Sequence, residues 1–296
     1  MNTIIKVLQL IPIEKLRTKV IHALLDYVNE EPILTKNGFL VLYNSHGLIK
    51  TVRKQVITGL YEKEEIFIYK KIIKAGDIVI DVGANEGYMS LIFSKLVGER
   101  GLVFSIEPDK YNVERLKKNM ALNKYSNVNV FECAVGKEKS VVQFYYTLDP
   151  DSGGGGAWGS LLKNPMSNAD ASVEVQVETL DSLLSNVENV SFIKIDTEGS
   201  EYDVFKGAEG IIDKAKPVIS FEVNLSKWAD METSVSHMFN YLESKGYNLY
   251  LPMNGRLTKL EWLNSRIMNV FAIHKTNEGY FEGTGILTID KNRSLS

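Results

Sequence analysis

Short apolar runs alternate with amphipathic stretches over most of the chain. Five runs have the length and continuity of buried strands: Ile78–Val82, Leu102–Ile106, Val128–Phe131, Phe192–Ile195 and Val218–Phe221. Apolar positions three and four residues apart predict helices over Glu62–Lys74, Tyr88–Val97, Asp109–Leu122 and Thr233–Ser244, with another through Phe205. Two later runs, Tyr247–Leu251 and Met268–Ile273, complete the set of strands. This alternation predicts right-handed βαβ units and a mainly parallel sheet with helices on both faces.

The segments on either side of this pattern are different. Residues 1–30 carry an apolar stripe at helical spacing, which predicts a helix that packs on the domain or on a partner, and a homodimer is one such arrangement. Residues 33–60 carry short β-like runs such as Gly38–Tyr43, which predict pieces of a hairpin. We therefore expect a helical and β-hairpin extension over 1–58, a main domain over 59–280 and a tail over 281–296.

An insertion over about 138–178 interrupts the alternation. Its flanks, Val141–Tyr146 and Val173–Val177, alternate like strands, and four consecutive glycines, Gly153–Gly156, lie between them. Two interpretations stay open for this middle part: a plain surface loop, or a loop that closes over a ligand. Trp158 favours the second, because an aromatic side chain beside hinge-like glycines can cover a pocket.

Composition and charge narrow the class of protein. The chain has 34 Lys and Arg against 37 Asp and Glu, a formal charge of −3, which argues against a general nucleic-acid-binding surface. The hydrophobic share of 44% is that of a globular protein. A lone cysteine, Cys133, fits a reducing compartment. The apolar stretch Ile4–Ile13 is shorter than the roughly 20 residues that span a bilayer, and no signal-peptide cleavage pattern follows it. We expect a cytoplasmic protein without a transmembrane segment.

The first candidate site lies where the Ile78–Val82 strand gives way to a helix. In this turn Asp81 is followed by Gly83, Asn85 and Gly87, and the glycines permit a tight turn and close approach of a ligand to the backbone. The spacing is neither the glycine pattern of dinucleotide-binding proteins nor a phosphate loop. Asp81 would repel a pyrophosphate, whereas it suits a ligand that carries ammonium and sulfonium charges.

The ends of the next two strands extend this site. Glu107 follows Asp81 by 26 residues, and a strand-end acid about 20 residues after such a turn accepts hydrogen bonds from ribose hydroxyls. The third strand ends in Phe131–Gly136, which places Cys133 and Ala134 where an adenine ring would lie. We expect Cys133 to be a packing residue rather than a nucleophile.

At this point the sequence resembles the FkbM family of S-adenosylmethionine-dependent methyltransferases. The resemblance extends over about 62–224 and rests on Asp81–Asn85, Ile106–Pro108, Thr179–Leu183, Ile193–Glu201, Phe205–Ala208 and Pro217–Glu222. It implies S-adenosyl-L-methionine as cofactor. It also implies a class I methyltransferase fold, which is a Rossmann-like α/β fold with a seven-stranded, mainly parallel sheet, helices on both faces and an antiparallel last strand. The family typically has a hydrophobic residue where this chain has Glu86.

A group of charged residues marks the expected reacting end. Lys194, Asp196, Glu198 and Glu201 cluster at the carboxyl end of the Phe192–Ile195 strand, and Glu222 lies at the end of the next one. Because ligands of open α/β sheets bind at this edge, Asp196, Glu198 and Glu222 are the candidate catalytic residues, and Asp196 is also a candidate for the methionine amine. A carboxylate in a partly dry site can act as general base toward a hydroxyl.

Other assignments of the same acids stay open. A divalent cation bridging Asp196, Glu198 and Glu222 would lower the pKa of a hydroxyl directly, although we favour a site without metal. Glu201 suits the start of a helix, where acids interact well with the helix dipole.

These residues predict an O-methyltransferase that acts on a hydroxyl of a sugar, a glycan or another small metabolite, and not on nucleic acid. Two alternatives remain. An N-methyltransferase on the same scaffold would need no strong base, and a non-catalytic module would bind S-adenosylmethionine without transferring its methyl group.

Overall fold

The computed structural model describes residues 32–42, 49–146, 159–160, 171–225, 235–261 and 267–287. The helix expected over 1–30, the Gly153–Gly156 loop with Trp158, and residues 288–296 lie outside the described residues. No helix within the described ranges has the length and apolar character needed to cross a membrane.

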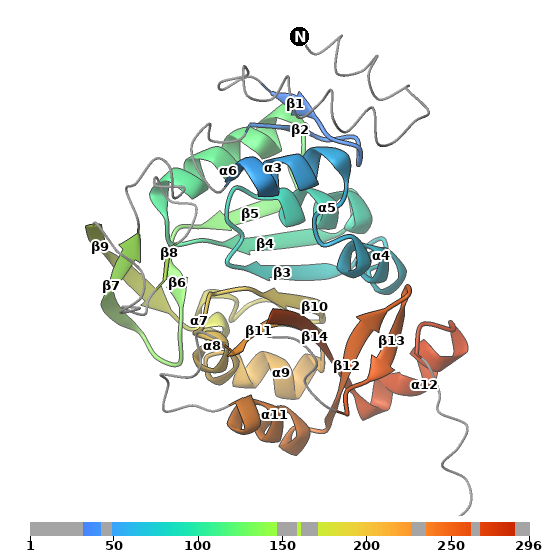
Figure 1. Cartoon of the computed structure of the whole chain (residues 1–296). Coiled ribbons are helices and arrows are strands. Elements are labelled where there is room, and N and C mark those ends of the chain that lie inside the picture. The colour runs from blue at the N-terminus through green and yellow to red at the C-terminus, as the bar shows by residue number, and fades with distance from the viewer. Residues whose placement is uncertain are drawn as a thin grey trace, which may run out of the picture.

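The described chain is built around an eight-stranded sheet with helices on both faces (Figure 1). Its strands lie in the order β13 (Arg256–Lys259), β12 (Tyr247–Met253), β14 (Ile267–His274), β11 (Val218–Asn224), β10 (Val190–Ile195), β3 (Ile78–Val82), β4 (Leu102–Ile106) and β5 (Val128–Phe131). The pairings from β11 to β5 are parallel, while β14 is antiparallel to both of its neighbours. The α/β fold class with an antiparallel last strand is therefore confirmed.

The eighth strand, β13, was not expected. It forms a hairpin with β12 through Asn254 and Gly255, because Met253 pairs with Arg256 directly across the turn. Both turn residues have positive φ angles, 52° and 72°, which is the geometry that an Asn-Gly pair adopts readily between two antiparallel strands. The prediction of seven strands missed this turn signal.

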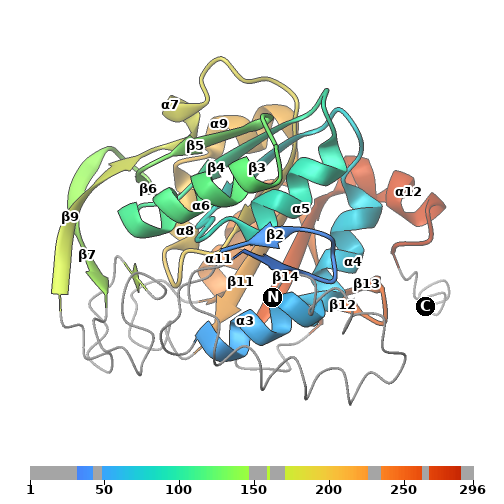
Figure 2. The same cartoon turned by 90° about the horizontal axis from the view of Figure 1, so that it is seen from above.

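Two hydrophobic layers hold the helices on the sheet. On one face α4 (Lys63–Ile72), α5 (Tyr88–Val97) and α6 (Lys110–Leu122) pack in one core. On the other, α7 (Leu180–Leu183), α8 (Glu201–Lys206), α9 (Glu209–Ala215) and α11 (Val235–Ser244) pack in a second. Figure 2 shows the two sets of helices from above. A last helix, α12 (Lys275–Gly283), follows β14, and its Phe281 joins the first core.

The segment before the main sheet is only partly a hairpin. Strands β1 (Ile33–Leu34) and β2 (Leu40–Val41) pair antiparallel, as expected. Residues Ile49–Thr58 form a helix, α3, so the prediction of β-like pieces up to residue 60 was wrong there. Its apolar residues stand at 49, 52, 56 and 57, which is helical spacing, and this spacing prevails over the β preference of the branched side chains.

Two asparagines bind this hairpin to α6. The Asn123 amide accepts from the Leu40 N–H at 2.9 Å and donates to the Leu40 carbonyl at 2.6 Å. One turn earlier, Asn119 makes the same pair of contacts with Leu42, at 2.7 and 3.3 Å. Since the two residues are four apart, their amides lie on one face of the helix and take the place of a neighbouring strand. The hairpin is therefore fixed by backbone contacts that depend on these two side chains.

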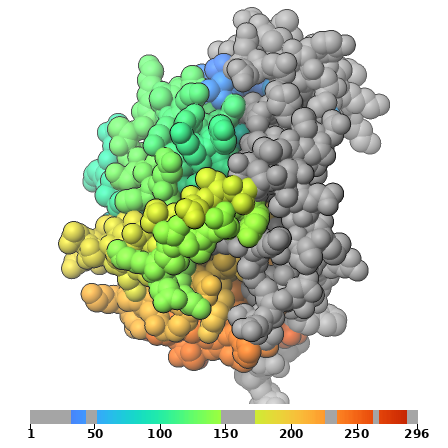
Figure 3. All heavy atoms as spheres, turned by 90° about the vertical axis from the view of Figure 1, so that its left-hand side faces the viewer, coloured from blue at the N-terminus to red at the C-terminus, as the bar shows by residue number. Residues whose placement is uncertain are grey.

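The insertion forms a small sheet of its own. Strands β6 (Ala134–Val135), β7 (Ser140–Tyr146), β8 (Gly159–Ser160) and β9 (Ala171–Glu178) are ordered β6-β9-β7-β8. The strands expected on either side of the glycines are thus present as β7 and β9, paired antiparallel. Figure 3 looks onto the face of the molecule where this sheet, in green and yellow, lies at the surface.

Asn123→Ala removes two contacts to the hairpin backbone. We expect the free energy of unfolding to fall by about 1–3 kcal/mol, because the Leu40 N–H and C=O lose their partners. Denaturant unfolding measures this loss, with Lys118→Ala, an exposed position of the same helix, as control. Equal stability of the two variants would show that the amide does not hold the hairpin.

Candidate active site

A cavity of about 180 Å³ opens at the carboxyl edge of the parallel strands. Its lining comes from the residues that end β3, β4, β5 and β10, where chain turns gather by the geometry of a parallel sheet. The predicted residues in this lining are Asp81, Gly83, Asn85, Glu107, Cys133, Ala134, Asp196 and Glu198. Lys194, which the sequence placed at the reacting end without a role, also lines it, and so do Val52 and Tyr61, which the sequence did not assign to the site.

Gly83 allows the turn after β3 to lie directly against the end of β10. Its φ angle is +76°, and a Cβ atom built on it would lie 1.9 Å from the carbonyl oxygen of Asp196. The Asp196 N–H in turn donates to the carbonyl of Val82 at 3.0 Å. The close approach of these two backbones therefore requires glycine at position 83.

The Glu107 carboxyl is held by three donors. Its Oε2 accepts from the Asn85 N–H at 2.8 Å, and its Oε1 accepts from the Asp109 N–H at 3.0 Å and from the Asn112 side chain at 3.2 Å. Burial raises the pKa of Glu107 to about 7, although these donors oppose the rise. The arrangement fixes the carboxyl at the cavity wall and ties the β3 turn to the end of β4.

Asp81 is fully buried and only half satisfied. Its Oδ2 accepts a hydrogen bond from the Ser90 hydroxyl at 2.6 Å, whereas its Oδ1 has no hydrogen-bond partner among the described residues. Burial raises the pKa of Asp81, and the positive charge of Lys194 opposes this rise. A buried, unpartnered carboxylate oxygen beside a cavity is the atom that a bound donor or cation would satisfy.

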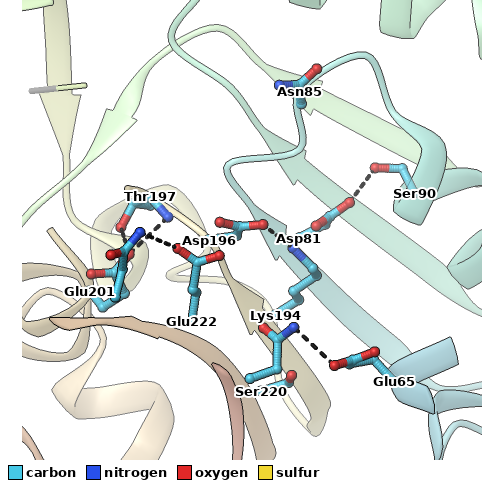
Figure 4. Close-up of polar contacts among 12 residues, drawn as sticks. Glu65, Asp81, Asn85, Ser90, Lys194, Asp196, Thr197, Glu201, Ser220 and Glu222 are labelled. Carbon is cyan, nitrogen blue, oxygen red and sulfur yellow. Dashed lines mark hydrogen bonds and ion pairs between the residues drawn. The ribbon is translucent and has the colours of Figure 1, made fainter. Parts of the chain in front are cut away.

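Lys194 lies between the two acids that end β3 and β10 (Figure 4). Its ammonium contacts Asp196 Oδ2 at 2.8 Å, and the residue is 3% exposed. Burial by itself would lower the pKa of Lys194, but the nearby charges of Asp196, Glu62 and Asp81 raise it well above its ordinary value. Lys194 therefore stays charged and neutralises part of an otherwise acidic site.

Glu201 organises the turn that follows Asp196. Its Oε1 accepts from the Thr197 N–H at 3.1 Å, the Thr197 hydroxyl at 3.2 Å and the Gly199 N–H at 3.1 Å. Inside this turn Glu198 has a φ angle of +58°, a left-handed conformation that is uncommon for residues other than glycine. The turn thereby brings Glu198 into the cavity lining.

Glu222 stands behind Asp196 and is not part of the lining. Its carboxyl points toward Asp196 in Figure 4, and it accepts a weak hydrogen bond from the Asn224 side chain at 3.4 Å. Burial, and then the charges of Asp196 and Glu201, raise the pKa of Glu222 to about 8. At neutral pH this carboxyl therefore carries a proton most of the time.

Gly87 and Glu86 belong to the same turn after β3 but have different positions relative to the cavity. Gly87 lies under the turn rather than in the lining, and a Cβ atom there would meet Leu116 Cγ at 2.7 Å. Glu86 lines the cavity, and its carboxyl lies 3.6 Å from the Arg115 guanidinium.

Within the described ranges, no three His, Cys, Asp or Glu side chains are grouped so that they could hold a metal ion. Asp196, Glu198 and Glu222 therefore do not form such a group in this structure.

Comparison with known proteins identifies the class to which this site belongs. The sequence model for the methyltransferase FkbM domain matches residues 81–249, and that for protein-L-isoaspartate (D-aspartate) O-methyltransferase matches residues 18–138. The fold and the matched domains define an S-adenosylmethionine-dependent methyltransferase. More narrowly, the chain belongs to the FkbM methyltransferase family.

Individual relatives are distant. "Methyltransferase 1" of Beauveria bassiana is 27% identical over 169 residues, which are 48% of this chain and 67% of that protein. "Methyltransferase sdnD" of Sordaria araneosa is 24% identical over 49% of this chain and 70% of that protein. The crystal structure of methyltransferase FkbM from Methylobacillus flagellatus aligns with a TM-score of 0.45 at 18% identity, over 75% of this chain and 54% of that one. The chain thus spans about half of that solved structure.

Gly83→Ala tests the close approach of the two turns. We expect it to abolish S-adenosylmethionine binding in calorimetry and to lower stability, because the new methyl group overlaps the Asp196 carbonyl. Gly98→Ala is the matched control, since Gly98 also has a positive φ but has no atom within 4 Å of the place where the new methyl group would lie. The control should lose about 1–3 kcal/mol of stability from backbone strain, because Gly98 has φ and ψ angles of 64° and −170°, and should keep its affinity. Equal effects in the two variants would contradict this account.

Proposed function

We propose that the cavity holds S-adenosylmethionine with its ribose on Glu107, its adenine beside Cys133 and Ala134, and its methionine ammonium on Asp81. The residues fit this cofactor. Asp81 presents a buried oxygen that has no hydrogen-bond partner in the described part of the chain, and Gly83 leaves the backbone uncovered by a side chain where the two turns meet. Glu107 is held with its carboxyl at the cavity wall, where a ribose diol can donate to both of its oxygens.

We propose further that the enzyme is an O-methyltransferase. The observation that carries this is Glu222, a carboxyl with a pKa of about 8 directly behind Asp196. A base of this strength is matched to a hydroxyl acceptor, whose proton must leave as the new C–O bond forms. An amine acceptor attacks through a free electron pair and needs no such base.

Asp196, Glu198 and Glu222 have different roles in the proposed methyl transfer. When bound, the cofactor supplies an electrophilic methyl group whose C–S bond breaks as the C–O bond forms. Asp196 and Glu198, which line the cavity, orient the acceptor hydroxyl. The Asp196 carboxylate accepts the hydroxyl proton and passes it to ionised Glu222, because Glu222 does not itself reach the lining. Most of the rate enhancement comes from alignment of hydroxyl, methyl and sulfur.

The acceptor we propose is a sugar, a glycan precursor or another small polyhydroxylated metabolite in the cytoplasm. The closely spaced carboxyls of the cavity support it, because each carboxylate accepts two hydrogen bonds from neighbouring hydroxyls. The net charge of −3 speaks against a nucleic acid. A homodimer through residues 1–30 stays a proposal from the sequence pattern, since that segment lies outside the described residues.

Glu222→Gln tests the role of the base. With wild-type protein and S-adenosylmethionine, a panel of sugars, nucleotide sugars and glycan fragments is screened for a gain of one methyl group by mass. On the acceptor found, we expect Glu222→Gln to lower the transfer rate by about 10²–10⁴-fold, with cofactor affinity in calorimetry within about twofold of wild type. The wild-type rate should rise with pH and level off above about pH 8, because only ionised Glu222 accepts the proton.

Glu188→Gln is the control for this experiment, since Glu188 is exposed before β10, at the opposite edge of the sheet. It should behave as wild type. Unchanged transfer by Glu222→Gln would contradict the base and favour an amine acceptor. If the wild-type protein bound neither S-adenosylmethionine nor S-adenosylhomocysteine, the assignment of the cavity would be contradicted.

A further inference from the structure

A strained residue lies at the start of α4, next to the site. Glu62 has φ and ψ angles of 39° and 45°, a left-handed conformation that costs a non-glycine residue about 1–2 kcal/mol. Glycine would occupy this position without strain. Of the seven non-glycine residues with positive φ in the described ranges, Asn85 and Glu198 line the cavity, and Lys124, Asn189, Lys216 and Asn254 do not. Strained residues are often kept at functional sites because their side chains are needed there.

The side chain of Glu62 lies near enough to the charged centre of the site for the charges of Lys194 and Asp196 to act on it. Its carboxyl also accepts a hydrogen bond from the Tyr61 side chain. Its Oε2 is buried and has no hydrogen-bond partner among the described residues. Burial raises the pKa of Glu62 to about 7, the charge of Lys194 lowers it, and the charge of Asp196 raises it.

The remaining groups around Glu62 come from α4 and α5. Glu65 is the other carboxylate near it on α4, and it accepts a hydrogen bond from Asn269 at 3.2 Å. The Tyr69 and Tyr88 hydroxyls also feel the charge of Glu62. Among these groups near Glu62, Lys194 carries the positive charge. The carboxyls of Glu62, Asp81 and Asp196 all interact with that charge.

Tyr61 connects Glu62 to the cavity. It belongs to the lining, and its ring packs edge-on against Tyr88 with centroids 6.1 Å apart. The Tyr88 hydroxyl accepts from the Asn37 side chain at 2.7 Å, so the hairpin before α3 supports the same wall. These residues precede position 81, where the match to the FkbM domain begins.

We propose that Glu62 is a positioning residue that acts through Lys194, and that it adjusts the charge of the site to favour S-adenosylmethionine over S-adenosylhomocysteine. This inference rests on the cofactor assignment proposed above. Ionised Glu62 draws the Lys194 ammonium toward itself, which leaves Asp81 and Asp196 less neutralised. A more negative site prefers the sulfonium cofactor, whereas its thioether product lacks that positive charge. When Glu62 is protonated, the Lys194 ammonium interacts mainly with Asp81 and Asp196, and the preference for S-adenosylmethionine weakens.

The same arrangement helps the product to leave. Methyl transfer removes the positive charge on sulfur, and a site that was balanced for that charge then holds an excess of carboxylate. S-adenosylhomocysteine is accordingly bound less tightly than the substrate cofactor while Glu62 is ionised. Glu62 thereby couples release of the product to the protonation state of the site.

The test compares the two cofactor forms without any acceptor. Calorimetry at pH 6 and pH 8 gives the ratio of S-adenosylmethionine affinity to S-adenosylhomocysteine affinity for the full chain. We expect this ratio to rise by about three- to tenfold with pH in the wild type. Glu62→Gln should lose at least half of this rise and stay near the wild-type ratio at pH 6. A simple loss of structure would lower both affinities without changing the ratio.

Glu64→Gln is the matched control, because Glu64 lies in the same turn but is exposed and bonds to the Gly255 N–H. It should keep the wild-type rise. Glu62→Gly removes the carboxyl and relieves the strained backbone, so it supplies a folded variant for the same measurement. A wild-type pH dependence that persists in both Glu62 variants would overturn the proposal, as would a ratio that is independent of pH in the wild type. Absence of binding of both compounds would count against the cofactor assignment instead.

Discussion

A buried ammonium group determines how the acids of this site can coexist. Lys194 is 3% exposed, its ammonium contacts Asp196, and the charges of Asp81 and Glu62 also act on it. Three neighbouring carboxyls in a partly dry site would repel one another strongly without a cation, because charge interactions strengthen as water is excluded. The 2.8 Å contact with Asp196 shows where Lys194 is held. The ends of β3 and β10 and the start of α4 thus interact electrostatically through one side chain.

This contact is possible only because two backbones meet at the edge of the sheet. Gly83 leaves room for the Asp196 carbonyl, and Glu107 ties the same turn to the next strand. The proposed cofactor side and the proposed reacting side of the cavity are therefore directly connected rather than two separate sites. Asn119 extends this connection outward, because its amide contacts both the Glu86 carbonyl and the Leu42 backbone. The hairpin before α3 is anchored through that residue.

The sequence was sufficient for the parts that depend on local pattern. The turn from Asp81, Glu107 and Asp196 could be placed together, because parallel strands end at one edge. Helix α3 was missed because its branched residues look β-like, and β13 because the Asn254–Gly255 turn was not recognised. Glu62 could not be found at all. Its electrostatic interaction with Lys194 acts between residues 132 positions apart, and no sequence periodicity indicates such a pair.

The most direct test of the central role of Lys194 is the unfolding free energy of Lys194→Met at pH 8 and at pH 5. Without the ammonium, Asp81 and Glu62 lose their counter-charge, so their folded pKa values rise further above the unfolded ones. The folded protein then loses stability as the pH rises from the unfolded pKa values of these acids to their folded ones. Below that range the acids are protonated in both states and the loss is smaller. The account predicts a loss of about 3–5 kcal/mol relative to wild type at pH 8 and a clearly smaller loss at pH 5. An equal loss at both pH values, or none at pH 8, would contradict it.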